Sequence, residues 1–205
     1  MTLSYVLLPV IILLFLIGIS TVASVLTGRI PPIPSMPPVI SFIISNIKKH
    51  DPNGSNIADI GSGYGFLLFR LAKAFPDRRI YGYEISFVPY LLSQFIKMAF
   101  RFKNVAIIRG DAFKDIETQK AVFSSAIAYF FSQPAMQKRL EHLATHHVEN
   151  IMIINAYPLN LPLYEESGKL DVFGSKVYIY KMPPSPLAGE GKNCPGFPPP
   201  NFRRG

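Results

Sequence analysis

The sequence predicts an α/β fold, in which a parallel sheet carries helices on both faces and one apolar N-terminal helix precedes the domain. Two observations predict it. Between residues 56 and 155, short apolar runs alternate with longer helical patterns. The first apolar run ends in the glycine-rich segment Ala58–Gly65, and a helical pattern follows directly. Strand, glycine loop and helix in this order form the first unit of a nucleotide-binding sheet.

The remaining elements follow from the same patterns. A helix is predicted over 39–49, ended by the turn residues of segment 51–54. Strands are predicted at 56–60, 80–84, 105–109, 125–130 and 150–155, with helices at 66–75, 89–102 and 133–145. A loop over 157–169 then leads to two short strands, 170–173 and 176–181, which we expect to pair antiparallel at the edge of the sheet.

The glycine loop has the most specific pattern in the chain. Its three glycines occupy every second position, as G-x-G-x-G, and an aspartate stands two residues before the first. Glycines allow a sharp turn and a close approach of the backbone to a ligand. The following helix offers free N–H groups and a positive dipole end. We therefore expect ligand contacts from Asp59, Gly61, Ser62, Gly63, Tyr64 and Gly65.

Two further acidic residues follow later strands. Glu84 ends the second predicted strand, about 20 residues past the glycine loop, where Rossmann-like folds bind ribose hydroxyls. Asp111 follows the third predicted strand. Because ligands bind at the carboxyl ends of parallel strands, both should face the ligand of the glycine loop, together with their neighbours Ile85 and Ala112.

The loop and its aspartate resemble motif I of the class I S-adenosylmethionine (SAM) methyltransferases, whose pattern is D/E-x-G-x-G-x-G. The resemblance implies a Rossmann-like class I methyltransferase sheet with SAM as the cofactor. It implies that Asp59 faces the methionine ammonium and that the start of the following helix faces the methionine carboxylate. By the same resemblance, Glu84 binds both ribose hydroxyls, Asp111 accepts the adenine amino group, and the N–H of Ala112 donates to the ring.

The order of parts is similar to that of a narrower group. These are the small membrane-associated lysine methyltransferases of the adenine nucleotide translocase and the ATP synthase c-subunit, with their bacterial relatives. The similarity covers roughly residues 3–182 and includes an Ile-Pro-Ser connector, Gly-Tyr-Glu at 82–84 and a final hairpin. It implies a lysine of a membrane protein as methyl acceptor. Many relatives have aspartate in place of Tyr64. The tyrosine either only packs over the cofactor, or it alters the choice of acceptor or weakens the activity.

The N-terminal segment predicts a membrane anchor. Residues 3–26 contain no charge and are long enough to span a bilayer as a helix. A cleavable signal peptide is the alternative, with a weak cleavage site at 21–23. No Lys or Arg precedes the apolar run, which favours an uncleaved single-pass anchor with the N-terminus outside and the catalytic domain cytoplasmic. The expected partners are the lipid bilayer, through residues 3–26, and a membrane-protein substrate.

Composition limits the other partners. The formal net charge is +8 and Cys194 is the only cysteine, which excludes an intramolecular disulfide and a zinc cluster. We expect no metal. We also expect no nucleic acid, because no known binding motif and no basic stripe with interleaved aromatics is evident. The basic residues are expected on a solvated surface or near anionic headgroups.

Few residues are candidates for the chemistry itself. In methyl transfer from SAM the protein mainly supplies proximity and alignment. Tyr129 ends the fourth predicted strand, where this fold places substrate-facing residues, and is the candidate catalytic residue. It can equally belong to an aromatic cluster with Phe130 and Phe131. The histidines at 142, 146 and 147 are expected at the surface.

The expected organisation has four parts: a transmembrane anchor over 1–27, a proline-rich connector over 28–38, a methyltransferase domain over 39–182 and a disordered tail over 183–205. The expected function is SAM-dependent methylation of a membrane-protein lysine. Two alternatives remain open: a small amphipathic or lipid acceptor, and a SAM-binding membrane protein without catalysis.

Overall fold

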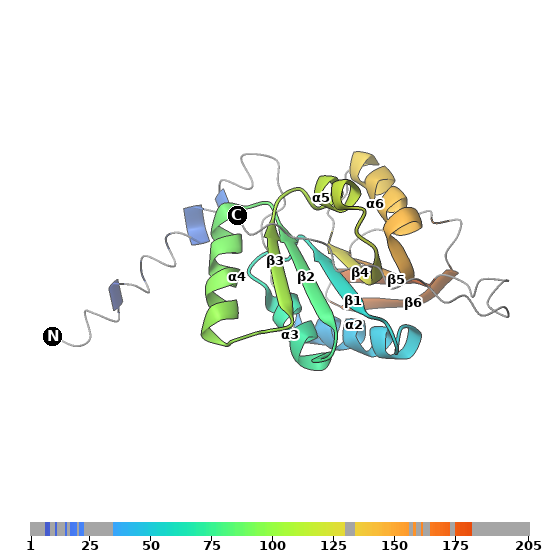
Figure 1. Ribbon diagram of the computed structural model, residues 1–205, viewed down its shortest axis with the longest axis horizontal. Coiled ribbons are helices and arrows are strands. Elements are labelled where there is room, and N and C mark those ends of the chain that lie inside the picture. Colours follow the sequence, from blue (N-terminus) through green and yellow to red (C-terminus); the bar gives the residue numbers. More distant parts are fainter. Residues whose placement is uncertain are drawn as a thin grey trace.

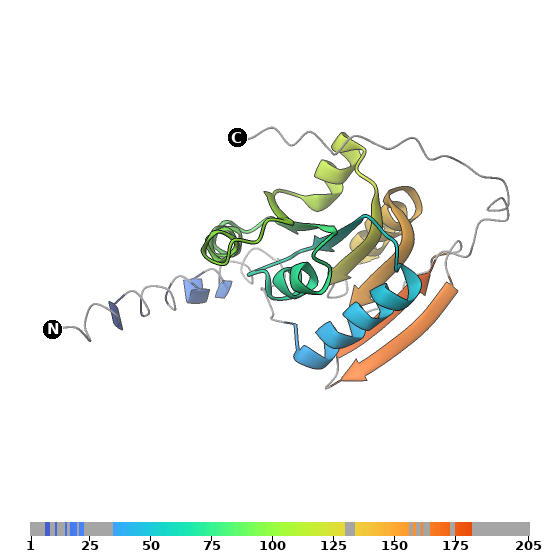
Figure 2. The ribbon, with the colours of Figure 1, turned by 60° about the horizontal axis from the view of Figure 1, so that its bottom comes forward.

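The computed structural model describes residues 7, 8, 11, 15, 17–19, 21, 22, 35–129, 134–155, 158, 161, 165–172 and 175–181. In the body of the domain a seven-stranded sheet has helices on both faces (Figures 1 and 2). The helices are α2 (Pro37–His50), α3 (Phe66–Ala74), α4 (Phe87–Ala99), α5 (Ala112–Gln119) and α6 (Pro134–His147). The strands are β1 (Asn56–Ile60), β2 (Arg79–Glu84), β3 (Val105–Arg109), β4 (Phe123–Tyr129), β5 (Val148–Asn155), β6 (Glu165–Val172) and β7 (Ser175–Lys181).

The strand order is β3-β2-β1-β4-β5-β7-β6. The first five strands in this order run parallel, whereas β7 is antiparallel to both of its neighbours. The chain moves outward from β1 to β3 and then returns to pair β4 with the other side of β1. A reversal of this kind marks the place where open α/β sheets bind ligands, at the carboxyl ends of the strands. The α/β prediction is therefore confirmed.

The sheet separates two apolar cores. Residues of α5 and α6 pack on one face, and residues of α2 and α3 pack on the other, where Tyr90 and Ile96 of α4 add to the core. In β1, every residue after Asn56 is buried, because this strand lies in the interior of the sheet with helices above and below. This burial explains why its sequence is apolar except for Asp59.

Two elements differ from the prediction. Helix α5 was not predicted, although Asp111 caps its N-terminus by accepting from the Phe113 N–H at 3.1 Å. The helix has only 8 residues, fewer than the window of about 11–18 residues over which a helical period can be recognised in a sequence. Strand β6 begins at Glu165, inside the segment predicted as a loop, because it pairs along β7 up to Lys181. Pairing with a partner strand outweighs its polar composition.

The transmembrane helix predicted over 3–26 is not found among the positions of this segment that the structure describes. The described positions between 7 and 22 are helical, and Thr21 donates to the Ile17 carbonyl at 2.9 Å. Across the described residues, no helix has the length and apolar character needed to cross a membrane. Most of the predicted span lies outside the described residues, as do connector residues 28–34 and tail residues 183–205.

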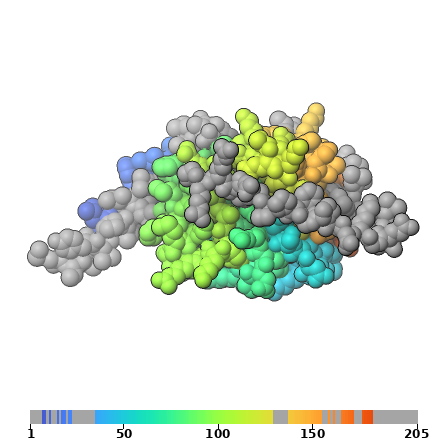
Figure 3. All heavy atoms as spheres, viewed as in Figure 1, coloured from blue at the N-terminus to red at the C-terminus, as the bar shows by residue number. Residues whose placement is uncertain are grey.

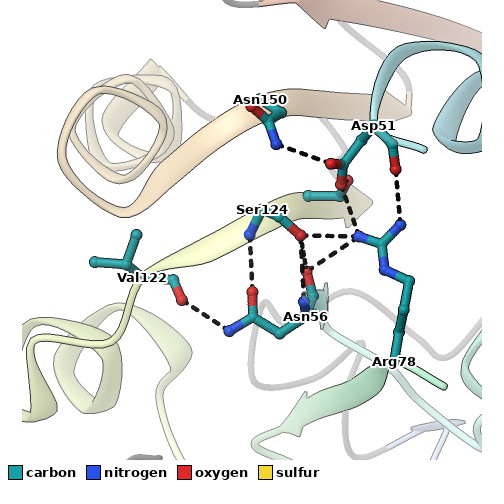
Figure 4. Close-up of polar contacts among 7 residues, drawn as sticks. Asp51, Asn56, Arg78, Val122, Ser124 and Asn150 are labelled. Atoms are coloured by element: carbon teal, nitrogen blue, oxygen red, sulfur yellow. Dashed lines mark hydrogen bonds and ion pairs between the residues drawn. The ribbon is translucent and has the colours of Figure 1, made fainter. Parts of the chain in front are cut away.

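A buried polar network joins the amino ends of the central strands (Figure 4). Arg78 and Asp51, 7% and 2% exposed, form an ion pair with 2.6 Å between Nη2 and Oδ2. The Arg78 guanidinium also donates to Ser124 Oγ at 2.8 Å. Asp51 accepts from Asn150 Nδ2 at 2.8 Å and from the Ser125 hydroxyl. The network connects the end of α2 to β2, β4 and β5, at the edge opposite the carboxyl ends.

Candidate functional site

The predicted site residues meet at the carboxyl edge of four adjacent strands. Asp59 lies near the end of β1, Glu84 ends β2, and Tyr129 ends β4. Asp111 follows β3, whose last residue pairs with Glu84. Ile60 is paired with residues 83 and 128 in the flanking strands, so the strands end at one level. The topology thus brings together residues up to 70 positions apart in the sequence, Asp59 and Tyr129.

The glycine loop folds over the end of β2. The φ angles of Gly61, Gly63 and Gly65 are +79°, +55° and +84°. They lie in the left-handed region of the backbone, where residues other than glycine are strained. The N–H groups of Gly61 and Ser62 both donate to the Tyr83 carbonyl at 2.9 Å. No side chain caps α3 at Gly65. The first amides of α3 therefore remain available to an anionic group of a ligand.

Replacement of Gly65 by alanine is expected to disrupt the loop. A Cβ at this position would lie 2.5 Å from a ring carbon of Phe69, in a backbone with φ of +84°. We expect the free energy of unfolding to fall by about 1–3 kcal/mol and cofactor affinity to fall with it. Denaturant unfolding measures the free energy of unfolding, and titration calorimetry measures the cofactor affinity. Gly168→Ala is the control, because its Cβ would make only ordinary contacts, the nearest at 3.6 Å; equal stability of both variants would contradict the prediction.

The Glu84 carboxylate fixes the glycine loop and can still accept further hydrogen bonds. Its Oε2 accepts from the Gly63 N–H at 2.8 Å, and its Oε1 accepts from the Ser86 N–H at 2.6 Å. The residue is 7% exposed, so these bonds fix the carboxylate in one position. Each carboxylate oxygen has a second lone pair. The pair of oxygens can therefore accept from two neighbouring hydroxyls, as the ribose prediction requires.

Asp59 is buried with an unsatisfied oxygen. The residue is 1% exposed, and its Oδ2 has no hydrogen-bond partner among the described residues, nor has the hydroxyl of Ser62. Burial, and then the charge of Glu84, raise the pKa of Asp59 to about 7. A buried carboxylate oxygen without a hydrogen-bond partner is costly unless a cationic group approaches it. The residues present therefore fit a ligand that carries a cationic group close to its hydroxyls, as SAM does.

The raised pKa predicts a pH-dependent affinity for SAM. Below about pH 7 the free protein holds Asp59 protonated, so the ammonium meets a neutral acid. Affinity should fall as the pH drops through this value, by up to about tenfold per unit, with proton release on binding. Calorimetry between about pH 6 and 8, in buffers of different ionisation enthalpy, measures both. The isosteric Asp59→Asn variant should bind weakly at every pH; a flat wild-type profile would argue against this role.

Asp111 has a partner that sequence reasoning missed. Arg139 of α6 donates through Nη2 to both carboxylate oxygens of Asp111, at 3.1 and 3.0 Å. The guanidinium lies over the ring of Phe113, 4.3 Å from its centre. The Asp111 side chain is 28% exposed, so it remains accessible beside this pair. No sequence signal identifies Arg139, since it stands 28 residues away on another helix. The N–H of Ala112 belongs to the first turn of α5.

The remaining predicted residues lie around this edge. Ile85 is 46% exposed next to Glu84. The Tyr64 ring meets Phe66 edge-on, with 6.5 Å between ring centres. Tyr129 has only its backbone described, opposite Asn155 in β5, so its catalytic role stays a prediction. Residues 130 and 131 lie outside the described residues.

The histidines lie away from this edge. His142 approaches Glu117 at 3.6 Å, with both side chains about half exposed. His147, expected at the surface, is instead buried, and its Nδ1 bonds to the Ala121 carbonyl at 2.8 Å. Within the described part of the chain, no three His, Cys, Asp or Glu side chains form a group that could hold a metal.

Comparison with known proteins identifies the fold. Residues 53–147 match a family described as "Putative methyltransferase". An RNA methyltransferase from Salinibacter ruber, in complex with S-adenosylhomocysteine, superposes with a TM-score of 0.58 and 19% identity over 74% of this chain and 94% of that one. Magnesium protoporphyrin IX methyltransferase from Synechocystis superposes with a TM-score of 0.56 and 15% sequence identity, over 70% of this chain and 81% of that one. The fold is that of the class I SAM-dependent methyltransferases, so SAM as the cofactor of this fold is confirmed.

Curated proteins with a higher sequence identity to this chain than these structures are named after one and the same activity. The tRNA (guanine-N(7)-)-methyltransferase of Debaryomyces hansenii is 31% identical over 115 residues, which are 50% of this chain and 39% of the relative. The enzyme of the same name from Kluyveromyces lactis is 30% identical over 122 residues, 55% and 43% of the two chains. The chain thus spans about two fifths of the length of these relatives.

These relatives correct the predicted partners. The sequence suggested a membrane-protein substrate, the bilayer as a partner and no nucleic acid. The matched proteins are named as tRNA methyltransferases, which overturns the exclusion of nucleic acid and removes support from the membrane-associated lysine methyltransferase type. The resemblance to that type rested on the order of parts and on short words of sequence, whereas the methyltransferase family match covers residues 53–147, which include the glycine loop and the strands that follow it.

Proposed function

We propose that this protein transfers a methyl group from SAM to a guanine base of RNA. The observation that supports methyl transfer is the carboxyl-edge site, where the unsatisfied Oδ2 of Asp59, the fixed Glu84 carboxylate and the glycine loop meet. The acceptor class is inferred from the relatives named tRNA (guanine-N(7)-)-methyltransferase. The net charge of +8 suits a polyanionic substrate.

The residues of the site hold and align the cofactor. When bound, SAM supplies an electrophilic methyl group on a sulfonium. The Glu84 carboxylate, already fixed by two backbone N–H donors, fits two hydroxyls without moving. Asp59 supplies negative charge in a buried position, and the first amides of α3 supply positive dipoles. Fixed groups of opposite sign on either side of a zwitterion favour one orientation, which is the alignment that group transfer requires.

Guanine N7 suits a site built in this way. This ring nitrogen is a hydrogen-bond acceptor with an in-plane lone pair, so it attacks without first losing a proton. A lysine acceptor must be neutral before it attacks and needs a group that removes its proton. The carboxylates near the end of β1 and at the end of β2 are assigned to cofactor binding here. A guanine nitrogen as acceptor therefore needs no proton-removing group among the described residues, whereas a lysine amine needs one.

A labelling experiment tests the proposal. The full chain is incubated with SAM labelled in the methyl group and an unmodified tRNA transcript, and the RNA is digested to nucleosides. We expect label in 7-methylguanosine, and none with the Asp59→Asn variant. Parallel incubations contain membrane protein or lipid extract in place of RNA. Label confined to protein or lipid would contradict the RNA acceptor, and absence of label everywhere would contradict catalysis.

A further inference from the structure

The outer face of α4 is apolar and exposed. Phe87, Leu91, Phe95 and Met98 recur at intervals of four, four and three residues and so form one stripe along the helix. With Phe100, which follows the helix, they are between 52% and 70% exposed. The core contacts of α4 come from other positions, including Tyr90 and Ile96. The stripe is therefore not needed to attach α4 to the sheet.

The same surface is basic. Residues 85–110 contain four basic residues and no acidic one. Arg101 and Lys103 are exposed directly after α4, where phenylalanines and basic residues alternate from Phe100 to Lys103. Two cations lie on aromatic rings: the Arg109 guanidinium is 5.0 Å from the centre of the Phe87 ring, and Lys73 Nζ is 5.9 Å from that of Phe102. Aromatic and basic groups are thus interleaved, contrary to the expectation from the sequence.

The stripe begins at the cofactor edge. Helix α4 starts three residues after Glu84, and the exposed ring of Phe66 stands at the start of α3, next to the glycine loop. From there α4 runs along one flank of the domain (Figure 3). Its 13 residues give it a length of about 20 Å. A chain lying along α4 would therefore have one end beside the site of methyl transfer.

We propose that this surface binds single-stranded RNA, with bases stacked on Phe87, Phe95 and Phe100 and phosphates paired with Lys97 and Arg101. We call these five residues the α4 surface. Single-stranded nucleic acids bind proteins through aromatic platforms inside positively charged grooves. A purely apolar partner would not explain four cations without one carboxylate. An anionic lipid surface would attract the cations but has no planar groups to stack on the exposed aromatic rings, whereas the bases of a nucleic acid do stack on them. The inference rests on the proposed function, since it places the substrate beside the same cofactor site.

Ring-specific variants test the stacking. Phe95→Leu combined with Phe100→Leu keeps apolar area but removes both rings. The probe is a fluorescent RNA of mixed sequence, about 12 nucleotides long. We expect its dissociation constant to rise at least about tenfold, with the SAM affinity unchanged. Unchanged RNA affinity would overturn the proposal. A loss of binding to vesicles of phosphatidylcholine and phosphatidylserine, or a loss of self-association, without a loss of RNA binding would also overturn it.

Charge variants test the phosphate contacts. Lys97→Glu combined with Arg101→Glu should weaken RNA binding and flatten its dependence on salt concentration. The control is Lys48→Glu combined with Lys49→Glu, since these residues are exposed on α2, away from α4 in both ribbon views (Figures 1 and 2). An equal loss of RNA affinity in the two double variants would indicate a general attraction of RNA to a basic protein, and it would overturn the assignment of the α4 surface.

Methyl transfer measured on the same variants separates the two proposals. If wild type and α4 variants methylate the tRNA transcript equally well, the α4 surface is wrong and the proposed function stands. If wild type binds the RNA through α4 but transfers methyl only to protein or lipid, the proposed function is wrong and the surface stands. If wild type binds no RNA, the surface is wrong whatever the methyl acceptor is.

Discussion

Replacement of Glu84 by glutamine is expected to lower the affinity for SAM by roughly 10- to 150-fold, the equivalent of one charge-assisted hydrogen bond. Two effects combine. The neutral amide accepts more weakly from hydroxyls, and its NH2 group cannot accept at all. Since the carboxylate also accepts from the Gly63 and Ser86 N–H groups, one of these donors loses its acceptor and the glycine loop is held less firmly.

Titration calorimetry of the purified full chain measures this effect. Glu117→Gln is the matched control, because it makes the same chemical change on a side chain that is 54% exposed on α5. The folded state of each variant is verified by circular dichroism. Full affinity in a folded Glu84→Gln protein would show that this carboxylate does not bind the cofactor, and the ribose assignment would fall.

Replacement of Arg78 by methionine is expected to give the largest loss of stability. It leaves the Asp51 carboxylate buried without its cation, and removal of one partner from a buried ion pair costs about 3–5 kcal/mol. For a chain of this size the midpoint of thermal unfolding should fall by about 6–20 °C. Cofactor affinity of the folded fraction should not change, because the network lies at the opposite edge of the sheet from Glu84.

Thermal unfolding monitored by circular dichroism measures the loss. Arg79→Met is the control, since the neighbouring arginine is exposed. The double variant with Asp51→Asn should recover part of the stability, because it removes the uncompensated charge. Equal midpoints for the two arginine variants would mean that solvent, and not the ion pair, satisfies Asp51.

Features encoded by neighbouring residues could be predicted from the sequence. The glycine loop, strands β1 to β5 and helices α2, α3, α4 and α6 each follow from local apolar patterns, and the order of acidic strand ends located Asp59, Glu84 and Asp111 at one edge. The Asp111–Arg139 pair and the network around Arg78 could not be predicted. They join residues far apart in the chain, and only the folded topology determines which of many charged residues meet.

The apolar helix α4 shows a second limit. A period of apolar residues predicts a helix and an apolar face, but it does not indicate what covers that face. In this chain Ile96 contacts the core while Phe95, the preceding residue, is 65% exposed. The same ambiguity affects the predicted partners, because apolar composition and an order of short words are shared by proteins with different substrates.

The network at the amino ends of the strands also constrains synthesis of the chain. Asp51 and Asn150, which share a buried hydrogen bond, are 99 residues apart. At ribosomal rates of about 5–20 residues per second, the second residue is added about 5–20 seconds after the first. During that interval the early helix and strands leave the ribosome with the Asp51 charge only partly compensated. We therefore expect the nascent chain to remain open to proteases and chaperones until β5 has emerged, and then to close in one cooperative step.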